Sequence, residues 1–241
     1  SHDPESLSNH TSVVRLNADG SLDASFGDGG KLIVPVSSTD DRAWSVMMQA
    51  DGKLVMVGYS ASAGTGSDFS AVRLNPDGSL DSSFGTSGKA IIPVSNADDA
   101  AWSIVQQPDG KLVVGGYTQS DSTGYDYSAV RLHTDGSLDT SFGTGGKAVV
   151  PVGTSSDLAY SLILQSDGKL VLAGESAVGS GVDFSAVRLN ADGSLDTTFN
   201  ARSTLDSVAN FTAGGSPVVL DGSVVVTDAD LSGLNAGAGL F

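Results

Sequence analysis

A motif that returns at intervals of about 58 residues limits what this chain can fold into. Four Arg-Leu pairs each lead into Asp-Gly-Ser-Leu-Asp, and they begin at Arg15, Arg73, Arg131 and Arg188. A second motif, Gln-x-Asp-Gly-Lys-Leu-Val, returns with the same step at Gln49, Gln107 and Gln165. Self-similarity at a fixed period indicates a repeat architecture in which each unit packs on its neighbours.

Each period contains four short strand candidates separated by turn signals. In the clearest copy these predicted strands are residues 69–75, 89–94, 101–107 and 111–117. Asp109-Gly110 predicts a tight hairpin of the primed-turn type, and residues 79–85 predict one helical turn capped by Ser79. The third and fourth strands are almost continuously apolar, which is typical of strands covered on both faces.

The sequence therefore predicts an all-β fold, a β-propeller-like array of four-stranded antiparallel units with about three and a half repeats of 58 residues. We expect an N-terminal arm at 1–11, the repeat domain at 12–203 and a β-strand-forming C-terminal tail at 204–241. The last unit contributes one strand, 184–190, which leaves its sheet incomplete. A sheet finished by the tail is favoured over closure between two chains, an open array or a truncated propeller.

The composition excludes several classes of partner. The net charge of −16 and only twelve basic residues argue against nucleic acid. There is no cysteine, which removes disulfides and thiol chemistry. No apolar stretch approaches the roughly 18 residues of a membrane span, so no membrane insertion is expected. The acidic side chains are almost all aspartate, which suits Ca²⁺ as a counter-ion.

The two motifs together resemble the delta-60 repeat, a tandem module of large secreted bacterial proteins. The resemblance covers roughly residues 12–200 and rests on Arg-Leu-Asn-x-Asp-Gly-Ser-Leu-Asp-x-Ser-Phe-Gly and Gln-x-Asp-Gly-Lys-Leu-Val-x-x-Gly. It implies a β-propeller-like module that is extracellular or at the cell surface, and it implies no catalytic residues. His133 stands where the other copies have Asn, and Asn200 stands where they have Gly.

The tail has a different composition and a different resemblance. Residues 216–230, Ser-Pro-Val-Val-Leu-Asp-Gly-Ser-Val-Val-Val-Thr-Asp-Ala-Asp, resemble the start of the cadherin-like repeats of calcium-dependent (RTX-type) bacterial adhesins. That likeness implies calcium binding by Asp228 and Asp230. The alternative is an arm that adds a strand to another subunit and builds an oligomer or filament. Its assembly residues would be Val218, Val219, Leu220, Val224, Val225 and Val226.

The Asp-Gly-Ser-Leu-Asp loops are candidate calcium sites, because oxygen-bearing side chains alternate along them. Asp-Gly is also a strong turn signal, so a purely structural turn is the favoured interpretation. The candidate ligands in the four loops are Asp19, Asp23, Asp77, Asp81, Asp135, Asp139, Asp192 and Asp196. The repeated arginine is expected to pair with a loop aspartate such as Asp81, and a ring of arginines that binds an anion is the alternative.

A third pattern, Asp-x-Ala-aromatic-Ser, lies at the start of the apolar third strand of each unit. An aromatic ring beside a carboxylate is typical of carbohydrate sites, but core packing is the favoured interpretation, because each aromatic residue starts a strongly apolar strand. The candidate glycan-binding residues are Asp41, Trp44, Asp99, Trp102, Asp157 and Tyr160.

No catalytic constellation is present in the sequence, because the Asp40-Asp41 pair is not kept in every unit and no catalytic motif appears. We therefore expect a non-enzymatic extracellular or cell-surface module of an adhesin-like protein that binds glycan or calcium through its loops. A self-assembling structural subunit is the alternative.

Overall fold

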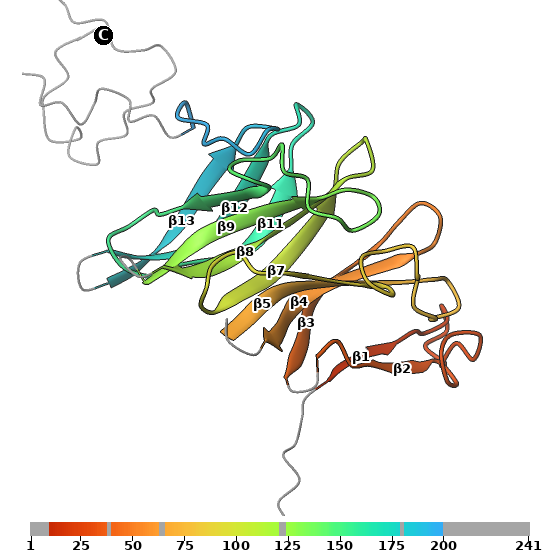
Figure 1. The fold of residues 1–241 in the computed structure, drawn as a ribbon. Helices are drawn as coiled ribbons and strands as arrows, with labels where there is room; N and C mark the ends of the chain where they lie inside the picture. Colours follow the sequence, from red (N-terminus) through yellow and green to blue (C-terminus); the bar gives the residue numbers. More distant parts are fainter. Residues whose placement is uncertain (1–9, 38–39, 63–65, 121–123, 179–180, 200–241) are drawn as a thin grey trace, which may run out of the picture. The chain divides into compact units, whose positions relative to one another are not determined.

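The computed structural model describes residues 10–37, 40–62, 66–120, 124–178 and 181–199. All of them lie in the first of the two units into which the chain divides, residues 1–201 and 202–241. Within the described ranges the chain forms thirteen strands and no helix. Figure 1 shows these strands gathered into successive sheets along the chain. The all-β prediction is confirmed.

The strands form four antiparallel sheets in chain order. The first sheet contains β1 (Thr11–Val14) and β2 (Lys31–Val34). The second contains β3 (Asp41–Met48), β4 (Leu54–Ser62), β5 (Gly66–Leu74) and β6 (Lys89–Ile92). The third contains β7 (Asp99–Gln106), β8 (Leu112–Ser120), β9 (Gly124–Leu132) and β10 (Lys147–Val150). The last contains β11 (Asp157–Leu164), β12 (Leu170–Val178) and β13 (Gly181–Leu189).

The two complete sheets are four-stranded meanders, because every strand pairs with the strand that follows it. That is the arrangement of a propeller blade. Each sheet begins half a period away from the Arg-Leu motif: it joins the third and fourth predicted strands of one period to the first and second of the next. The sequence repeat and the sheet therefore begin at different points of the chain.

Apolar side chains lie on both faces of the fully paired strands. In β4, Val55 and Val57 belong to the cluster shared with the third sheet, whereas Met56 belongs to the cluster shared with the first sheet. In β8, Val113 faces the last sheet and its neighbours face the second. The core is thus three clusters, each between two successive sheets, which explains the continuous apolar runs.

Two predicted turns differ in the structure. Residues 79–85 contain one hydrogen-bonded turn, in which the amide of Phe84 donates to the carbonyl of Asp81, but no helix. Ser79 does not cap this turn, because its hydroxyl donates to Asp77; the carboxylate of Asp81 caps it by accepting from Ser83. At the Asp109-Gly110 hairpin only the glycine has a positive φ, +85°, and its amide donates to the carbonyl of Gln107. A primed turn needs positive φ before this glycine too, so the hairpin is the type that ends in a left-handed glycine bulge.

The described sheets do not close into a ring. The first sheet has two strands and the last has three, and no strand of one pairs with a strand of the other. The predicted completion of the last sheet by the tail falls on residues outside the described ranges. In the part of the chain that the structure describes, no helix is long and apolar enough to cross a membrane.

Candidate functional site

A β-bulge places the recurring aromatic residue in each of β3, β7 and β11. The pairing with the neighbouring strand shifts between Ala43 and Ser45, between Ala101 and Ser103, and between Ala159 and Ser161. The residue left without a partner is Trp44, Trp102 or Tyr160. A bulge redirects a side chain relative to the regular pleat, and here it does so at the same position of three successive sheets.

The three aromatic side chains form a continuous row, because β7 neighbours both β3 and β11. The rings of Trp44 and Trp102 are stacked, with centroids 4.5 Å apart and 11° between their planes. Tyr160 meets Trp102 edge to face at 5.1 Å. Tyr117 extends the group at 6.3 Å from Trp102, and Tyr125 follows at 5.1 Å from Tyr117. Trp44 and Tyr160, the ends of the row of three, are exposed to solvent.

Two tyrosine hydroxyls donate to acidic side chains, and one of these tyrosines, Tyr160, belongs to the row. The hydroxyl of Tyr160 donates to Glu175 Oε1 at 3.0 Å, and the hydroxyl of Tyr59 donates to Asp40 Oδ2 at 2.9 Å. Burial, with the hydrogen bond to the neighbouring carboxylate, raises the pKa of each tyrosine to about 12. Both phenols are therefore neutral hydrogen-bond donors at physiological pH.

The central ring of the row carries an unused donor. The indole Nε1 of Trp102 is shielded from solvent and has no hydrogen-bond acceptor among the described residues. Buried polar atoms are usually satisfied, so this unpartnered indole N–H is an exception at the middle of the aromatic row.

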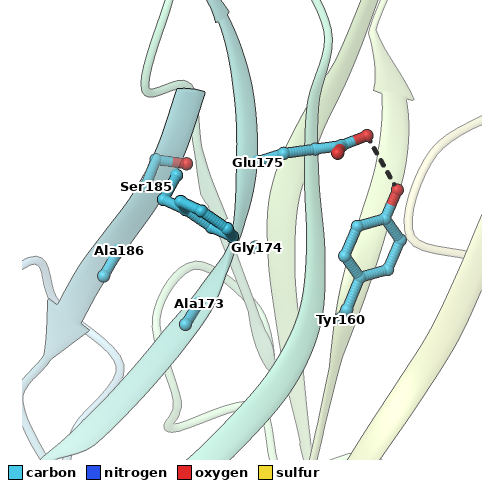
Figure 2. A pocket seen from close by; sticks show the side chains of 7 residues that line it. Tyr160, Ala173, Gly174, Glu175, Ser185 and Ala186 are labelled. Atoms are coloured by element: carbon cyan, nitrogen blue, oxygen red, sulfur yellow. Dashed lines mark hydrogen bonds between the residues drawn. The ribbon is translucent and has the colours of Figure 1, made fainter. Parts of the chain in front are cut away.

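A pocket lies where the row reaches the last sheet. Its volume is about 600 Å³, and Figure 2 shows Tyr160 and Glu175 on one side, joined by their hydrogen bond, with Ser185 and Ala186 of β13 on the other. The exposed ring of Phe184 also lines it. The pocket thus combines two aromatic rings with one carboxylate.

The aspartates of the Asp-x-Ala-aromatic-Ser pattern lie elsewhere. Asp41, Asp99 and Asp157 are buried, and each accepts hydrogen bonds from the backbone amides of the preceding loop. Asp99 also accepts from Thr118, and Asp157 accepts from Ser176. These three carboxylates therefore hold the loop before the bulge, and the acidic groups beside the rings are Asp40 and Glu175, which the pattern did not single out.

The repeated arginine forms the same network in the first three units, and in the last unit Arg188 keeps the contact with Asp196 and the stacking on Phe199. Arg73 Nε lies 2.7 Å from Asp81 Oδ2, its Nη2 donates to Ser83, and its guanidinium stacks on Phe84 at 4.7 Å. Its Nη1 donates to the carbonyl of Thr134 in the next unit at 2.5 Å. The expected Arg–Asp contact is present, but it is not bidentate, because the guanidinium divides its donors among three partners.

Three of these networks contain a lysine that the sequence did not point to. Lys53, Lys111 and Lys169, from the Asp-Gly-Lys hairpins, reach the loop aspartate of their own sheets at 2.9, 3.1 and 2.7 Å. Asp23 has no such lysine among the described residues, because the β1–β2 sheet lacks the corresponding hairpin. Lys53 and Ser83 hold the pKa of Asp81 far below its usual range.

A family described as "Domain of unknown function (DUF5122) beta-propeller" matches four segments of the sequence, residues 7–26, 49–84, 107–142 and 165–199. Together they span more than half of the chain. The chain belongs to this family. No curated protein matches the sequence.

The DUF5122 segments contain the arginine network and leave out the aromatic row. Each complete segment begins near the Asp-Gly-Lys hairpin and ends at or next to the phenylalanine under the arginine. Trp44, Trp102 and Tyr160 lie in the gaps between matched segments. The residues of the network thus lie in the segments that match the family, and the row lies in the sequence between these segments. Tyr59, Tyr117 and Glu175 occupy the same position in three successive repeats. This recurrence is the sequence signal that could have pointed to the polar groups near the aromatic residues.

The loop aspartates proposed as calcium ligands are already engaged. Asp19, Asp77, Asp135 and Asp192 each accept from the amide and hydroxyl of the serine two residues later. Asp23, Asp81, Asp139 and Asp196 each bind the arginine of their unit. Within the described residues no three His, Asp or Glu side chains are grouped closely enough to hold a metal ion. Calcium binding stays a prediction.

The tail candidates lie outside the described residues. They are Asp228 and Asp230 for calcium and Val218, Val219, Leu220, Val224, Val225 and Val226 for assembly. Both tail predictions, the cadherin-like domain and the strand-forming arm, therefore stay predictions.

Proposed function

We propose that this DUF5122 chain is a non-enzymatic carbohydrate-binding module. One observation carries the proposal: three bulges in successive sheets set Trp44, Trp102 and Tyr160 in one continuous row. Aromatic faces stack on the C–H faces of pyranose rings, and a row of them suits an extended chain of sugars.

The polar groups around the row have the chemistry that sugar hydroxyls need. Glu175 is an acceptor at one end of the row, next to the hydroxyl of Tyr160. The exposed rings of Trp44 and Tyr160 offer contact surface at both ends. A carbohydrate would bind along the row from Trp44 to Tyr160.

We further propose that the module works at the cell surface or outside the cell, as part of an adhesin-like protein. The likeness of its motifs to the secreted delta-60 repeat and of its tail to cadherin-like adhesin repeats supports this setting. A calcium requirement belongs to the same proposal. It predicts that a chelator lowers the melting temperature and that added Ca²⁺ restores it; an unchanged melting temperature would exclude it.

The proposal includes no catalysis, and the state of the carboxylate pairs supports that choice. Hydrolysis of a glycosidic bond requires two carboxyl groups that flank the bond. Of the adjacent pair Asp40 and Asp41, the second is buried under a loop and binds two backbone amides.

The test is tryptophan fluorescence and calorimetry against a panel of oligosaccharides. We expect at least one glycan to quench the tryptophan emission, and Trp44→Ala to weaken its binding by about tenfold, the loss of one stacking contact. Ile91→Ala is the matched control, since Ile91 is equally exposed but lies on β6, away from the row. A flat response to the whole panel, or equal effects of both substitutions, would refute carbohydrate binding.

A further inference from the structure

The last sheet exposes a face that the earlier sheets bury. Phe184 on β13 is fully exposed, at 102%, whereas Phe69 and Tyr127, at the same place in β5 and β9, are 0% exposed. Ile163 on β11 is also exposed. In the earlier sheets this face packs against the sheet that follows, and no described residue provides that sheet for β11–β13.

The first sheet exposes the opposite face. Leu16 is 57% exposed, whereas Leu74, Leu132 and Leu189, at the same place in the later units, are at most 1% exposed. Val14 is likewise exposed, although Val72 and Val130 are buried. In the later units these residues pack against the sheet that precedes. The two ends of the described array therefore present complementary halves of one joint.

The internal joints show what this joint consists of. Its apolar part places Phe69 in one cluster with Val130 and Leu132, and Tyr127 in one cluster with Val187 and Leu189. The aromatic residue of one sheet thus covers the Val-Arg-Leu segment of the next.

The polar part of each internal joint is two hydrogen bonds from one sheet to the Asp-Gly turn of the next unit. Arg131 Nη1 donates to the carbonyl of Ala191 at 2.8 Å, and the amide of Gly143 donates to the carbonyl of Asp192 at 2.7 Å. The joint between the second and third sheets repeats both bonds, from Arg73 to Thr134 and from Gly85 to Asp135.

At the two ends of the array, the donor and the acceptors of these hydrogen bonds have no such partner among the described residues. Arg188 binds Asp196 through Nε, but its Nη1 has no carbonyl acceptor in the part of the chain that the structure describes. The carbonyls of Ala18 and Asp19, which correspond to those of Thr134 and Asp135, receive no hydrogen bond from the described residues. The donor lies at one end of the array and the acceptors lie at the other.

We propose that the chain associates head to tail with a second copy of itself, with β1–β2 of one copy seated on β11–β13 of the other. Leu16 and Val14 would cover Phe184, and Arg188 would donate to the Ala18 carbonyl of the second copy. Such a contact joins two different surfaces, so it propagates into a ring or an open filament unless one end is blocked. It uses folded sheet faces and does not involve the valine-rich tail.

The charge of the chain determines how the association depends on ionic strength. Each copy carries −16, so repulsion opposes association at low ionic strength, and added salt screens it. Salt should therefore strengthen a contact whose core is Phe184, Val14 and Leu16.

Sedimentation velocity of the whole chain over a range of concentrations and salt tests the proposal. We expect oligomers that grow with both. Phe184→Asp and Leu16→Asp should each weaken association by about tenfold or more, because each places a carboxylate in the apolar centre of the contact. Ile91→Asp is the control, since Ile91 and Val149 are exposed in sheets whose neighbours are present.

Mixing the two variants gives the sharpest result. Phe184→Asp keeps a working first sheet and Leu16→Asp keeps a working last sheet, so their equimolar mixture should form dimers and nothing larger. A monomeric wild-type chain at every concentration and salt would overturn the proposal. So would oligomers that both substitutions leave unchanged, or a mixture in which dimers do not form.

Discussion

The Cβ atom of an alanine in place of Gly116 would lie 2.0 Å from the carbonyl oxygen of Ala100. Gly58 and Gly174 stand in the same relation to Arg42 and Leu158, at 1.8 and 1.9 Å. The bulge that redirects the aromatic residue brings one strand against the backbone of its neighbour, and only a residue without a side chain fits there. The glycine thus permits the bulge that sets each aromatic residue in the row.

Gly116→Ala should lower the free energy of unfolding by about 3 kcal/mol, because the backbone has to move away from the added carbon. Urea denaturation measures the change. Gly115→Ala is the matched control, since its Cβ would meet no backbone atom, only side chains, the nearest being Leu162 at 3.2 Å, and Val57 and Ala173 occupy the same position in the other units. It should cost clearly less than Gly116→Ala. Equal losses for the two substitutions would contradict the close approach at the bulge.

Arg73→Ala should destabilise the protein by about 3 kcal/mol, the lower end for a broken buried pair, since it removes one of the two cations that bind the buried Asp81 and Lys53 remains. Arg15→Ala should cost less, because Arg15 and Asp23 are more exposed to solvent than Arg73 and Asp81. Denaturant titration of both variants gives the comparison. A larger loss for Arg15→Ala would show that burial does not set the strength of the network.

Stability should fall in acid as the loop aspartates are protonated. The pKa values of Asp81 and Asp196 lie below the ordinary 3.8, chiefly because Lys53 and Lys169 hydrogen-bond to them. A lowered folded-state pKa stabilises the fold above the unfolded value and ceases to do so as pH falls through the folded value. The melting temperature should therefore drop below about pH 4. Lys53→Met should flatten that drop, and an identical acid profile would contradict the assignment.

Tyr160 should ionise late, with a pKa of about 12, because it is partly buried and donates to Glu175. Glu175→Gln removes the negative charge and should lower that pKa, since the phenolate is then no longer repelled. The ring resonances of labelled tyrosine report the titration by NMR. Tyr59, whose partner is Asp40, serves as the internal reference and should not move.

Local patterns predicted much of the fold. The four strands near residues 69, 89, 101 and 111 are found as β5, β6, β7 and β8. The Arg–Asp contact was also predictable, because a short stretch of strand and turn brings the chain from Arg73 back to Asp81. Both follow from interactions inside one repeat, where sequence distance and spatial distance agree.

The candidate site was predictable only in part. The recurring aromatic residues were visible, but the pattern paired them with Asp41, Asp99 and Asp157, which the structure buries under the preceding loop. The bulge separates the two side chains, and a bulge depends on the register between strands. Glu175 reaches Tyr160 only through the pairing of β11 with β12.

The sequence by itself determined the period, the strand content and the Arg–Asp contact of each unit, because these depend on contacts inside one repeat that recur unchanged. Only the tertiary structure decided where each sheet begins, which rings meet across β3, β7 and β11, and which faces stay open. Similar repeats carry similar side chains, so Phe69, Tyr127 and Phe184 follow the same pattern. Whether such a residue is core or surface depends on the neighbouring sheet.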